Sequence, residues 1–136
     1  MKFSDLYIGQ EERMSARFSM EQVKAFASVT QDFNPVHLDP LYAGQTIFKG
    51  NIVHGFLVGS LFSTILGTKM PGEGSIYLKQ NMKFLKPVYI DDTVTAVATI
   101  TDINPDKQLV TLNTTCYNQD GVVVIEGDAL VKKMDI

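Results

Sequence analysis

The chain has 136 residues, a length that fits one domain with a substantial hydrophobic core. Its composition, with 45% hydrophobic and 20% charged residues, is that of an ordinary globular protein and argues against disorder. Twelve basic and fifteen acidic residues give a net charge of −3, without the basic stripe typical of nucleic-acid binding.

The cysteine content and the apolar segments bear on where the protein acts. Cys116 is the only cysteine, so an internal disulfide and a cysteine-based metal site are excluded. The N-terminal segment lacks the basic and apolar regions of a secretory signal. The longest apolar stretch, from Ile52 to Leu66, contains polar residues and is too short to span a bilayer. These features predict a cytoplasmic protein without a membrane partner.

The first elements expected are a strand and a helix. Residues 10–18 alternate loosely between apolar and polar side chains, which indicates a strand. Ser19 and Gln22 have the spacing of a helix capping box, so a helix should follow and must end before Pro35. A short second helix is predicted over 40–46.

The second half of the chain predicts one buried helix and four strands. Residues 52–67 are apolar almost all round, which indicates a helix buried on most sides, with Gly67 placed to end it. The strands, rich in β-branched residues and separated by turn signals, are expected over 75–84, 93–103, 108–117 and 122–133. The last three should form an antiparallel meander. Together these elements predict a single domain over residues 1–136 of the α+β class, with an antiparallel β-sheet wrapped around a central apolar α-helix.

The segment over residues 31–39 is the most informative part of the chain. It contains an acid, Asp32, and an imidazole, His37, which would lie about 140° apart around a helix and on opposite faces of a strand. Pro35 lacks an N–H and pushes Asn34 into an extended conformation, so an irregular turn can aim both side chains at one spot. Because histidine titrates near neutral pH and a carboxylate can orient it or exchange protons itself, the pair predicts acid–base catalysis.

Each of these residues also has a purely structural interpretation. Asp32 and Asn34 are of types that cap helices and start turns, and His37 on its own can be a core histidine. His54 precedes Gly55 at the start of the central helix, where free backbone N–H groups can stabilise an oxyanion, or where glycine simply relieves crowding. Asp32 and the two histidines can be imagined as a facial triad, but no local histidine pairing supports one, so no metal is predicted.

These residues resemble the signature of the MaoC-like hot-dog hydratases, in particular the R-specific enoyl-CoA hydratases that feed polyhydroxyalkanoate synthesis. The resemblance covers nearly the whole chain, but the family's usual glycine before the aspartate is replaced by Gln31. It is carried by Asp-Phe-Asn-Pro-Val-His at 32–37, Ala43, Ile-Val-His-Gly at 52–55, Pro-Gly-Glu-Gly-Ser-Ile-Tyr-Leu at 71–78 and Val-Lys at 131–132.

The resemblance implies a hot-dog fold and reversible syn hydration of a short-chain trans-2-enoyl-CoA to an (R)-3-hydroxyacyl-CoA, with no metal or redox cofactor. Asp32 and His37 would be the catalytic pair. A water held between them would lose a proton to His37 and attack the β-carbon while Asp32 protonates the α-carbon, or the two roles would be shared or reversed. The backbone N–H of Gly55 would polarise the thioester carbonyl.

The resemblance also implies supporting residues and a partner. Asn34 would shape the turn, Ser63 would donate a hydrogen bond to Asp32, and Leu66 and Val131 would line an acyl pocket for short chains. The family implies a homodimer whose sheets join edge to edge, which would cover an exposed sheet edge. Candidates for binding the CoA phosphates, which nothing in the sequence ranks, are Lys49, Lys69, Lys83 and Lys86.

Three alternatives remain open. The first is a dehydratase that acts on acyl-carrier-protein substrates. A basic docking surface would support it, and the net charge of −3 argues against such a surface. A hot-dog thioesterase would use a carboxylate to activate water toward the carbonyl, whereas His37 and the small Gly55 suit hydration better. A non-catalytic acyl-CoA-binding module would have no reason to keep Asp32, Asn34 and His37 together.

Overall fold

Five strands form one antiparallel sheet in the order β1-β3-β4-β5-β2. The computed structural model describes all 136 residues. The strands lie within one residue of the sequence expectations, and the predicted meander of β3, β4 and β5 is confirmed. Their bounds are β1 Glu11–Arg17, β2 Ser75–Phe84, β3 Thr93–Asn104, β4 Leu109–Tyr117 and β5 Val123–Lys133.

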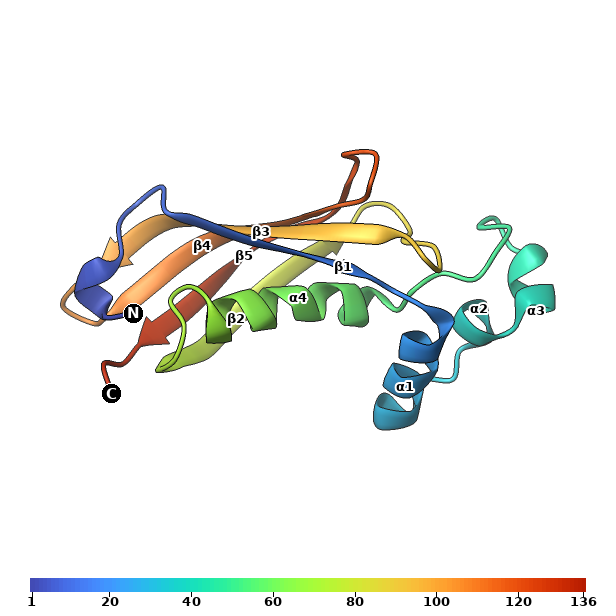
Figure 1. Cartoon of the computed structure of the whole chain (residues 1–136), viewed down its shortest axis with the longest axis horizontal. Coiled ribbons are helices and arrows are strands. Elements are labelled where there is room, and N and C mark those ends of the chain that lie inside the picture. The colour runs from blue at the N-terminus through green and yellow to red at the C-terminus, as the bar shows by residue number, and fades with distance from the viewer.

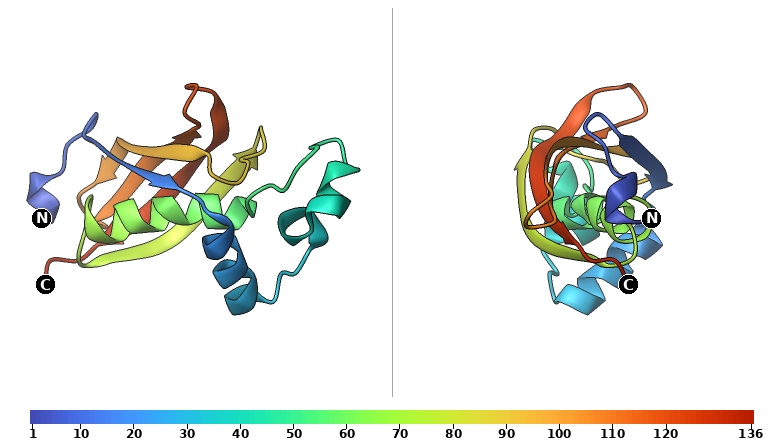
Figure 2. Two further views of the ribbon diagram at one scale, coloured as in Figure 1. Left: turned by 45° about the vertical axis from the view of Figure 1, so that its right-hand side comes forward. Right: turned by 90° about the vertical axis from the view of Figure 1, so that its left-hand side faces the viewer.

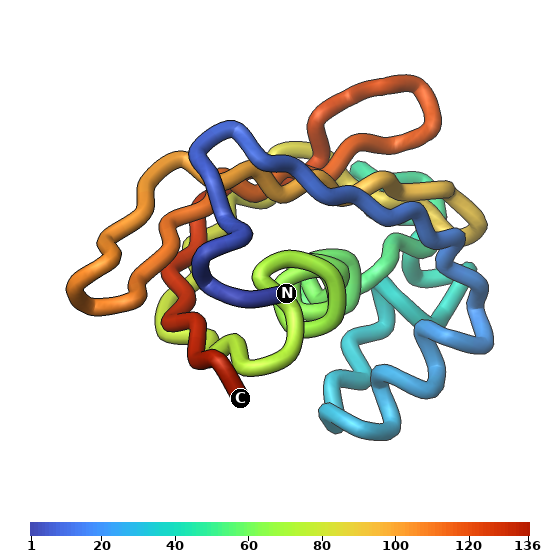
Figure 3. The backbone as a smooth tube through the Cα atoms, turned by 60° about the vertical axis from the view of Figure 1, so that its left-hand side comes forward, coloured from blue at the N-terminus to red at the C-terminus, as the bar shows by residue number.

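The helices divide into a central one and a group at one end of the sheet (Figure 1). The long helix α4 (Gly55–Thr68) runs along one face of the sheet, which curls around it (Figure 2). Figure 3 shows α4 nearly end-on inside this curve. The group at one end of the sheet comprises α1 (Met20–Thr30), α2 (Pro35–Leu38) and α3 (Pro40–Gly44). A short 3-10 helix, η1, spans Phe3–Asp5.

Helix α4 is buried because its apolar side chains face the sheet. Phe62, Ile65 and Leu66 are fully buried, and the helix contacts β1, β2, β3 and β4. Full burial of one such side chain contributes about 1.5–3 kcal/mol to folding. A sheet curled around one apolar helix is the hot-dog fold, so the predicted fold class is confirmed. No helix in the structure combines the length and the apolar character that crossing a membrane requires.

The predicted helix over 52–67 is wrong at its start. Ile52 forms a β-bridge with Tyr89, and the N–H of Val53 donates to the carbonyl of Val88 at 2.7 Å, so this segment is extended. The helix begins at Gly55 and continues one residue past Gly67. Tertiary hydrogen bonds therefore override the apolar pattern over 52–54 and place the N-terminus of α4 beside α1 and α2.

Candidate active site

The turn after α1 is held by side chains that bond to nearby backbone. Gln31 ends α1 in the left-handed conformation, with φ of 66°. A carboxylate oxygen of Asp32 then accepts the N–H of Asn34 at 3.3 Å, and the carboxamide oxygen of Asn34 accepts the N–H of Val36 at 3.1 Å. Asn34 thus caps α2, a short helix that the sequence did not predict and that carries His37.

One ring nitrogen of His37 has no hydrogen-bond partner within the chain. Its Nδ1 lies 2.7 Å from the carbonyl oxygen of Ile52, and because a carbonyl only accepts, Nδ1 carries the proton. The neutral ring therefore keeps its Nε2 lone pair available. Burial lowers the pKa of His37 below its usual value, an effect that the hydrogen bond to Ile52 opposes and the nearby His54 reinforces. The ring is suited to accept a proton at neutral pH.

His54 lies directly against this ring. The two imidazoles stack with centroids 3.8 Å apart and planes at 27°, and the ring of Phe26 packs on His54 with centroids 4.9 Å apart. The Nε2–H of His54 donates to the backbone carbonyl of Asp32 at 3.1 Å. His54 is only 2% exposed, and its Nδ1 has no hydrogen-bond partner.

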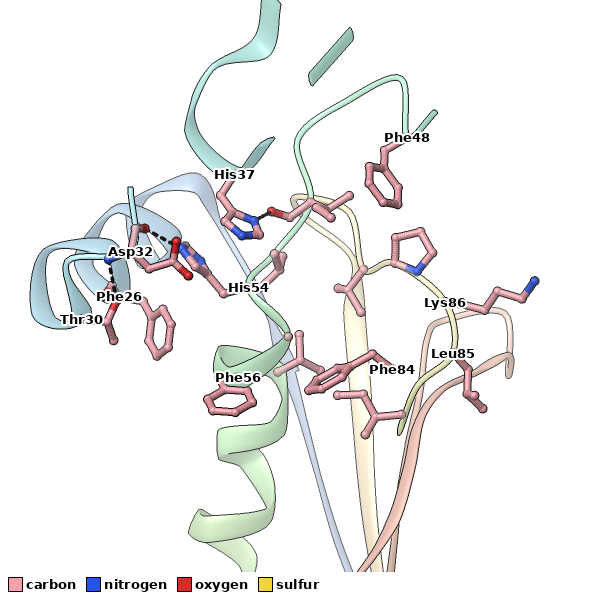
Figure 4. A pocket seen from close by; sticks show the side chains of 17 residues that line it. Phe26, Thr30, Asp32, His37, Phe48, His54, Phe56, Phe84, Leu85 and Lys86 are labelled. Atoms are coloured by element: carbon pink, nitrogen blue, oxygen red, sulfur yellow. Dashed lines mark hydrogen bonds between the residues drawn. The ribbon is translucent and has the colours of Figure 1, made fainter. Parts of the chain in front are cut away.

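The structure brings the predicted acid and imidazole together. One carboxylate oxygen of Asp32 and one ring nitrogen each of His37 and His54 lie within 4.8 Å of one another (Figure 4). A water that bonds to two groups spans about 5.5 Å at most, so Asp32 and His37 lie within reach of one bridging water. Lone pairs of imidazole nitrogens lie in the ring plane, so two stacked rings direct them side by side and not at one metal ion.

These groups open into an apolar pocket of about 530 Å³. This volume is within the usual range for small-molecule sites. Figure 4 shows Asp32, His37 and His54 on one side and Lys86 across the pocket from them. The apolar walls include Phe26, Phe48, Val58, Phe84 and Ile125.

The N-terminus of α4 contributes an unpaired donor to the same pocket. The His54 side chain does not cap the helix, and no acceptor binds the N–H of Gly55, which lines the pocket. A Cβ at position 55 would lie 2.6 Å from Cε1 of Phe84, so glycine allows this ring to pack against the helix start. Both interpretations of Gly55, an oxyanion donor and a relief of crowding, are compatible with this geometry.

Three predicted supporting residues lie away from the pocket. Ser63 is exposed on α4 and makes no hydrogen bond to Asp32 within the chain. Leu66 and Val131 are core residues and not pocket-lining residues. The physical reason is distance: Leu66 lies about 16 Å along the helix axis from Gly55, and Val131 lies about 20 Å along β5 from the pocket residue Ile125.

The structure ranks the four candidate lysines. Lys86 lines the pocket, whereas the other three do not. Sequence reasoning also missed the contacts of His54 and the pocket role of Phe26. The three- and four-residue spacing that predicts a shared face for Phe26 and Thr30 was an available signal, because both residues line the pocket.

Comparisons with known proteins show the family to which this chain is related. A family model described as a MaoC like domain matches residues 8–120. Over 132 residues the chain is 46% identical to the (R)-specific enoyl-CoA hydratase of Aeromonas caviae, covering 97% of this chain and 98% of that protein. It is 44% identical over 129 residues to the (R)-specific enoyl-CoA hydratase of Rhodospirillum rubrum, covering 95% and 89%.

Solved structures show the same architecture. The (R)-hydratase from A. caviae involved in PHA biosynthesis superposes with a TM-score of 0.93, covering 95% of this chain and 98% of that one. An unliganded R-hydratase from Pseudomonas aeruginosa, 35% identical, superposes with a TM-score of 0.94, covering 99% and 86%. The fold, the extent of the family match and the identity to these relatives show that this chain belongs to the MaoC-like family.

Proposed function

We propose that this protein is an R-specific enoyl-CoA hydratase that adds water reversibly to short-chain trans-2-enoyl-CoA thioesters. The observation that carries the proposal is the convergence of Asp32 and His37 in the lining of an apolar pocket that is also lined by Gly55, whose N–H has no acceptor. The relatives named (R)-specific enoyl-CoA hydratase support the reaction and the carrier.

The catalytic pair needs one proton shared between its two members. With Asp32 protonated and His37 neutral, Nε2 of His37 takes a proton from water as the water oxygen bonds to the β-carbon. Asp32 gives its proton to the α-carbon on the same face, and the proton on His37 then returns to Asp32. With the shared proton on His37 instead, the two roles are reversed. Either assignment balances the addition of one water, and no step needs a metal or a redox cofactor.

The open end of α4 supplies the electrostatic part of the mechanism. During addition, negative charge develops on the thioester oxygen as the α-carbon becomes enolate-like. The N–H of Gly55 has no acceptor and lies at the positive end of a helix of 14 residues. It can therefore donate to this oxygen, and oxyanion donors of this kind contribute about 3–4 kcal/mol to rate acceleration.

The test is hydration of crotonyl-CoA by the purified protein, followed as loss of enoyl-thioester absorbance, with the product resolved by chirality. We expect an R-alcohol and a rate unchanged by EDTA. Asp32→Asn and His37→Gln should each lower kcat by at least about a hundredfold with the fold intact. A wild-type protein that hydrolyses the thioester or only binds it would contradict the hydratase proposal, as would a marked preference for carrier-protein substrates.

We also propose that the protein is a homodimer joined at the β2 edge. Apolar side chains are exposed along this edge, with Leu78 at 51%, whereas the other edge strand, β1, carries charged residues that oppose pairing. Leu78 also lines a shallow groove between α4 and β2, and Phe56 of α4, which is 68% exposed, lines the same groove. Ser63 shares a helix face with Phe56, so its hydroxyl would meet a partner subunit and not its own Asp32.

The dimer is tested by light scattering coupled to size exclusion. Leu78→Lys should weaken the dimer, because a charge at the centre of the joined edge would be desolvated on pairing. Glu11→Lys on the β1 edge is the control and should leave the mass unchanged. A wild-type monomer, or a Leu78→Lys variant that remains dimeric, would contradict the proposed edge.

We further propose that the protein acts in the cytoplasm. Cys116 is a free, buried thiol, and burial raises its pKa to about 12, so it neither forms a disulfide nor acts as a nucleophile. Such a residue is compatible with a reducing compartment. Fractionation of cells that produce the protein tests this location.

A further inference from the structure

His54 contacts both members of the catalytic pair with one ring. Its face stacks on the imidazole of His37, with centroids 3.8 Å apart. Its edge donates Nε2–H to the backbone carbonyl of Asp32 at 3.1 Å. Asp32 and His37 come from segments on either side of Pro35, and neither segment contacts the other through an ion pair. The turn through Asn34 connects the two backbones, and His54 adds a direct link between the Asp32 carbonyl and the His37 ring.

The backbone of Asp32 depends on this contact. Asp32 follows the left-handed Gln31 and lies outside any helix or strand. The carbonyl of Asp32 accepts no backbone N–H, so His54 is its one hydrogen-bond donor. The other ties are the N–H of Asp32 on the Thr30 hydroxyl at 3.2 Å and its carboxylate on the N–H of Asn34. Without the His54 bond, Asp32 would keep only these two exposed contacts of 3.2 and 3.3 Å, and its carbonyl would have no donor within the chain.

His54 itself is well placed to act as an anchor. It is almost fully buried, it packs against Phe26, and its backbone is the N-cap of the rigid helix α4. The same element presents the N–H of Gly55 to the pocket. A displacement of α4 would thus move the oxyanion donor and the acid–base pair together.

We propose that His54 is a positioning residue that fixes the Asp32 carboxylate against His37 through its Nε2–H bond to the Asp32 carbonyl. The proposal rests on the catalytic roles proposed above for Asp32 and His37. Displacements of about 1 Å in a reacting group can cost a hundredfold in rate, so this bond is expected to act on kcat more than on substrate binding.

Two substitutions separate the hydrogen bond from the stacked ring. His54→Phe keeps an aromatic ring between Phe26 and His37 but has no donor. His54→Gln loses the ring, but its amide nitrogen stands where Nε2 stands and can donate to the Asp32 carbonyl. We expect His54→Phe to lower kcat by at least about tenfold with KM within about threefold, and His54→Gln to recover most of that loss. His54→Asn, whose shorter amide does not reach the carbonyl, should behave like His54→Phe.

A double-variant cycle shows whether His54 acts through Asp32. In an Asp32→Asn background, His54→Phe should cause little further loss, because the group that it positions is already disabled. Thermal melting of each variant identifies loss of fold, and the Gln and Asn pair keeps the test valid if His54→Phe does not fold. Equal losses in the Gln and Asn variants, a rise in KM with kcat unchanged, or additive losses in the cycle would each overturn the positioning role. If Asp32→Asn alone retains full activity, the proposed catalytic pair fails instead.

Discussion

Gln31 adopts a backbone conformation that favours glycine. Its φ of 66° places a side chain in the left-handed region at the end of α1, where a Cβ costs about 1 kcal/mol. This explains the position at which the resemblance predicts glycine. The side chain offsets part of the cost, because its amide donates to the carbonyl of Ser28 at 2.8 Å, an exposed contact.

We therefore expect Gln31→Gly to raise the free energy of unfolding by up to about 1 kcal/mol. Urea denaturation monitored by circular dichroism measures the change. Gln31→Ala is the matched control, because it loses the same hydrogen bond but keeps the Cβ, and it should be less stable than the wild type. If both variants lose stability equally, the bond to Ser28 outweighs the backbone strain.

The pKa of His37 sets a direction for the pH dependence of the reaction. Burial, the largest effect, lowers the pKa of His37, so the neutral, proton-accepting ring persists into mildly acidic solution. In the assignment in which Asp32 is the acid and His37 the base, protonation of His37 removes the base, so the rate should fall only as the pH drops through this lowered pKa. The ionisable neighbours that line the same pocket are Asp32, His54 and Lys86.

The measurement is kcat/KM for crotonyl-CoA as a function of pH, which reports the free enzyme. We expect the midpoint of the acid limb to lie below about 6.5, the ordinary value for imidazole. A midpoint above that value would show that the neutral ring is not the limiting base. His54→Gln, which leaves His37 as the one imidazole in the chain, identifies the titrating ring by NMR.

At the scale of elements, the start of α4 is compatible with both interpretations of Gly55 that the sequence left open. Gly55→Ala would place its Cβ 2.6 Å from the Phe84 ring, so the ring must swing away from the helix. Phe84 lines the pocket, and we expect this displacement to lower kcat/KM about tenfold. The amide N–H of residue 55 is present in both the wild type and Gly55→Ala, so the loss of activity would come from crowding.

A second substitution checks this cause. Phe84→Leu frees the space that the new methyl group needs, so the double variant should recover most of the activity relative to a Phe84→Leu control. Crotonyl-CoA kinetics on the four proteins measure the coupling. If the double variant remains as impaired as Gly55→Ala alone, the methyl group acts on the approach of the thioester to the N–H and not on Phe84.

How well each element could be predicted follows from how local its cause is. The capping box of Ser19 and Gln22 forms as the spacing predicts, and it starts α1 at Met20. The strands are marked by β-branched residues and turns, which are also local signals. By contrast, Ile52 and Val53 look helical by composition but pair with Tyr89 and Val88, and no local signal encodes these contacts.

The same distinction applies to the site. Asp32 and His37 are predictable because Pro35 and Asn34 force a turn between them, and the structure brings the two side chains together. The stacking of His54 on His37 joins residues far apart in sequence, so residue type alone does not reveal it. Leu66 and Val131 were placed by resemblance, and only the folded chain shows that they lie in the core.

At the scale of the whole molecule, the pocket and the chain termini lie at opposite ends of the sheet. The pocket lies beside α1 and α2, whereas the N- and C-termini lie near each other at the far end of the sheet (Figure 1). The termini are fastened by Asp135, whose carboxylate accepts the N–H of Phe3 at 2.8 Å and pairs with Lys133 at 3.3 Å. Lys133 is only 1% exposed, so its ammonium group depends on this carboxylate and on the carbonyl of Met134.

This terminal contact predicts a pH-dependent contribution to stability that is separate from activity. The hydrogen bond from Phe3, and then Lys133, lower the pKa of Asp135 below its usual value. A lowered pKa in the folded state means that the stabilisation is present above the unfolded-state pKa and is lost as the pH falls through the folded-state pKa. Asp135→Asn should therefore reduce the free energy of unfolding at pH 7, and the difference from the wild type should shrink at a pH below about 3.9.

Urea denaturation at pH 7 and at a pH below about 3.9 measures this difference. Crotonyl-CoA turnover should be unchanged, because the pocket lies at the other end of the sheet. A stability loss of equal size at both pH values would show that the charge on Asp135 contributes nothing, and that the amide simply packs less well against Phe3 and Lys133.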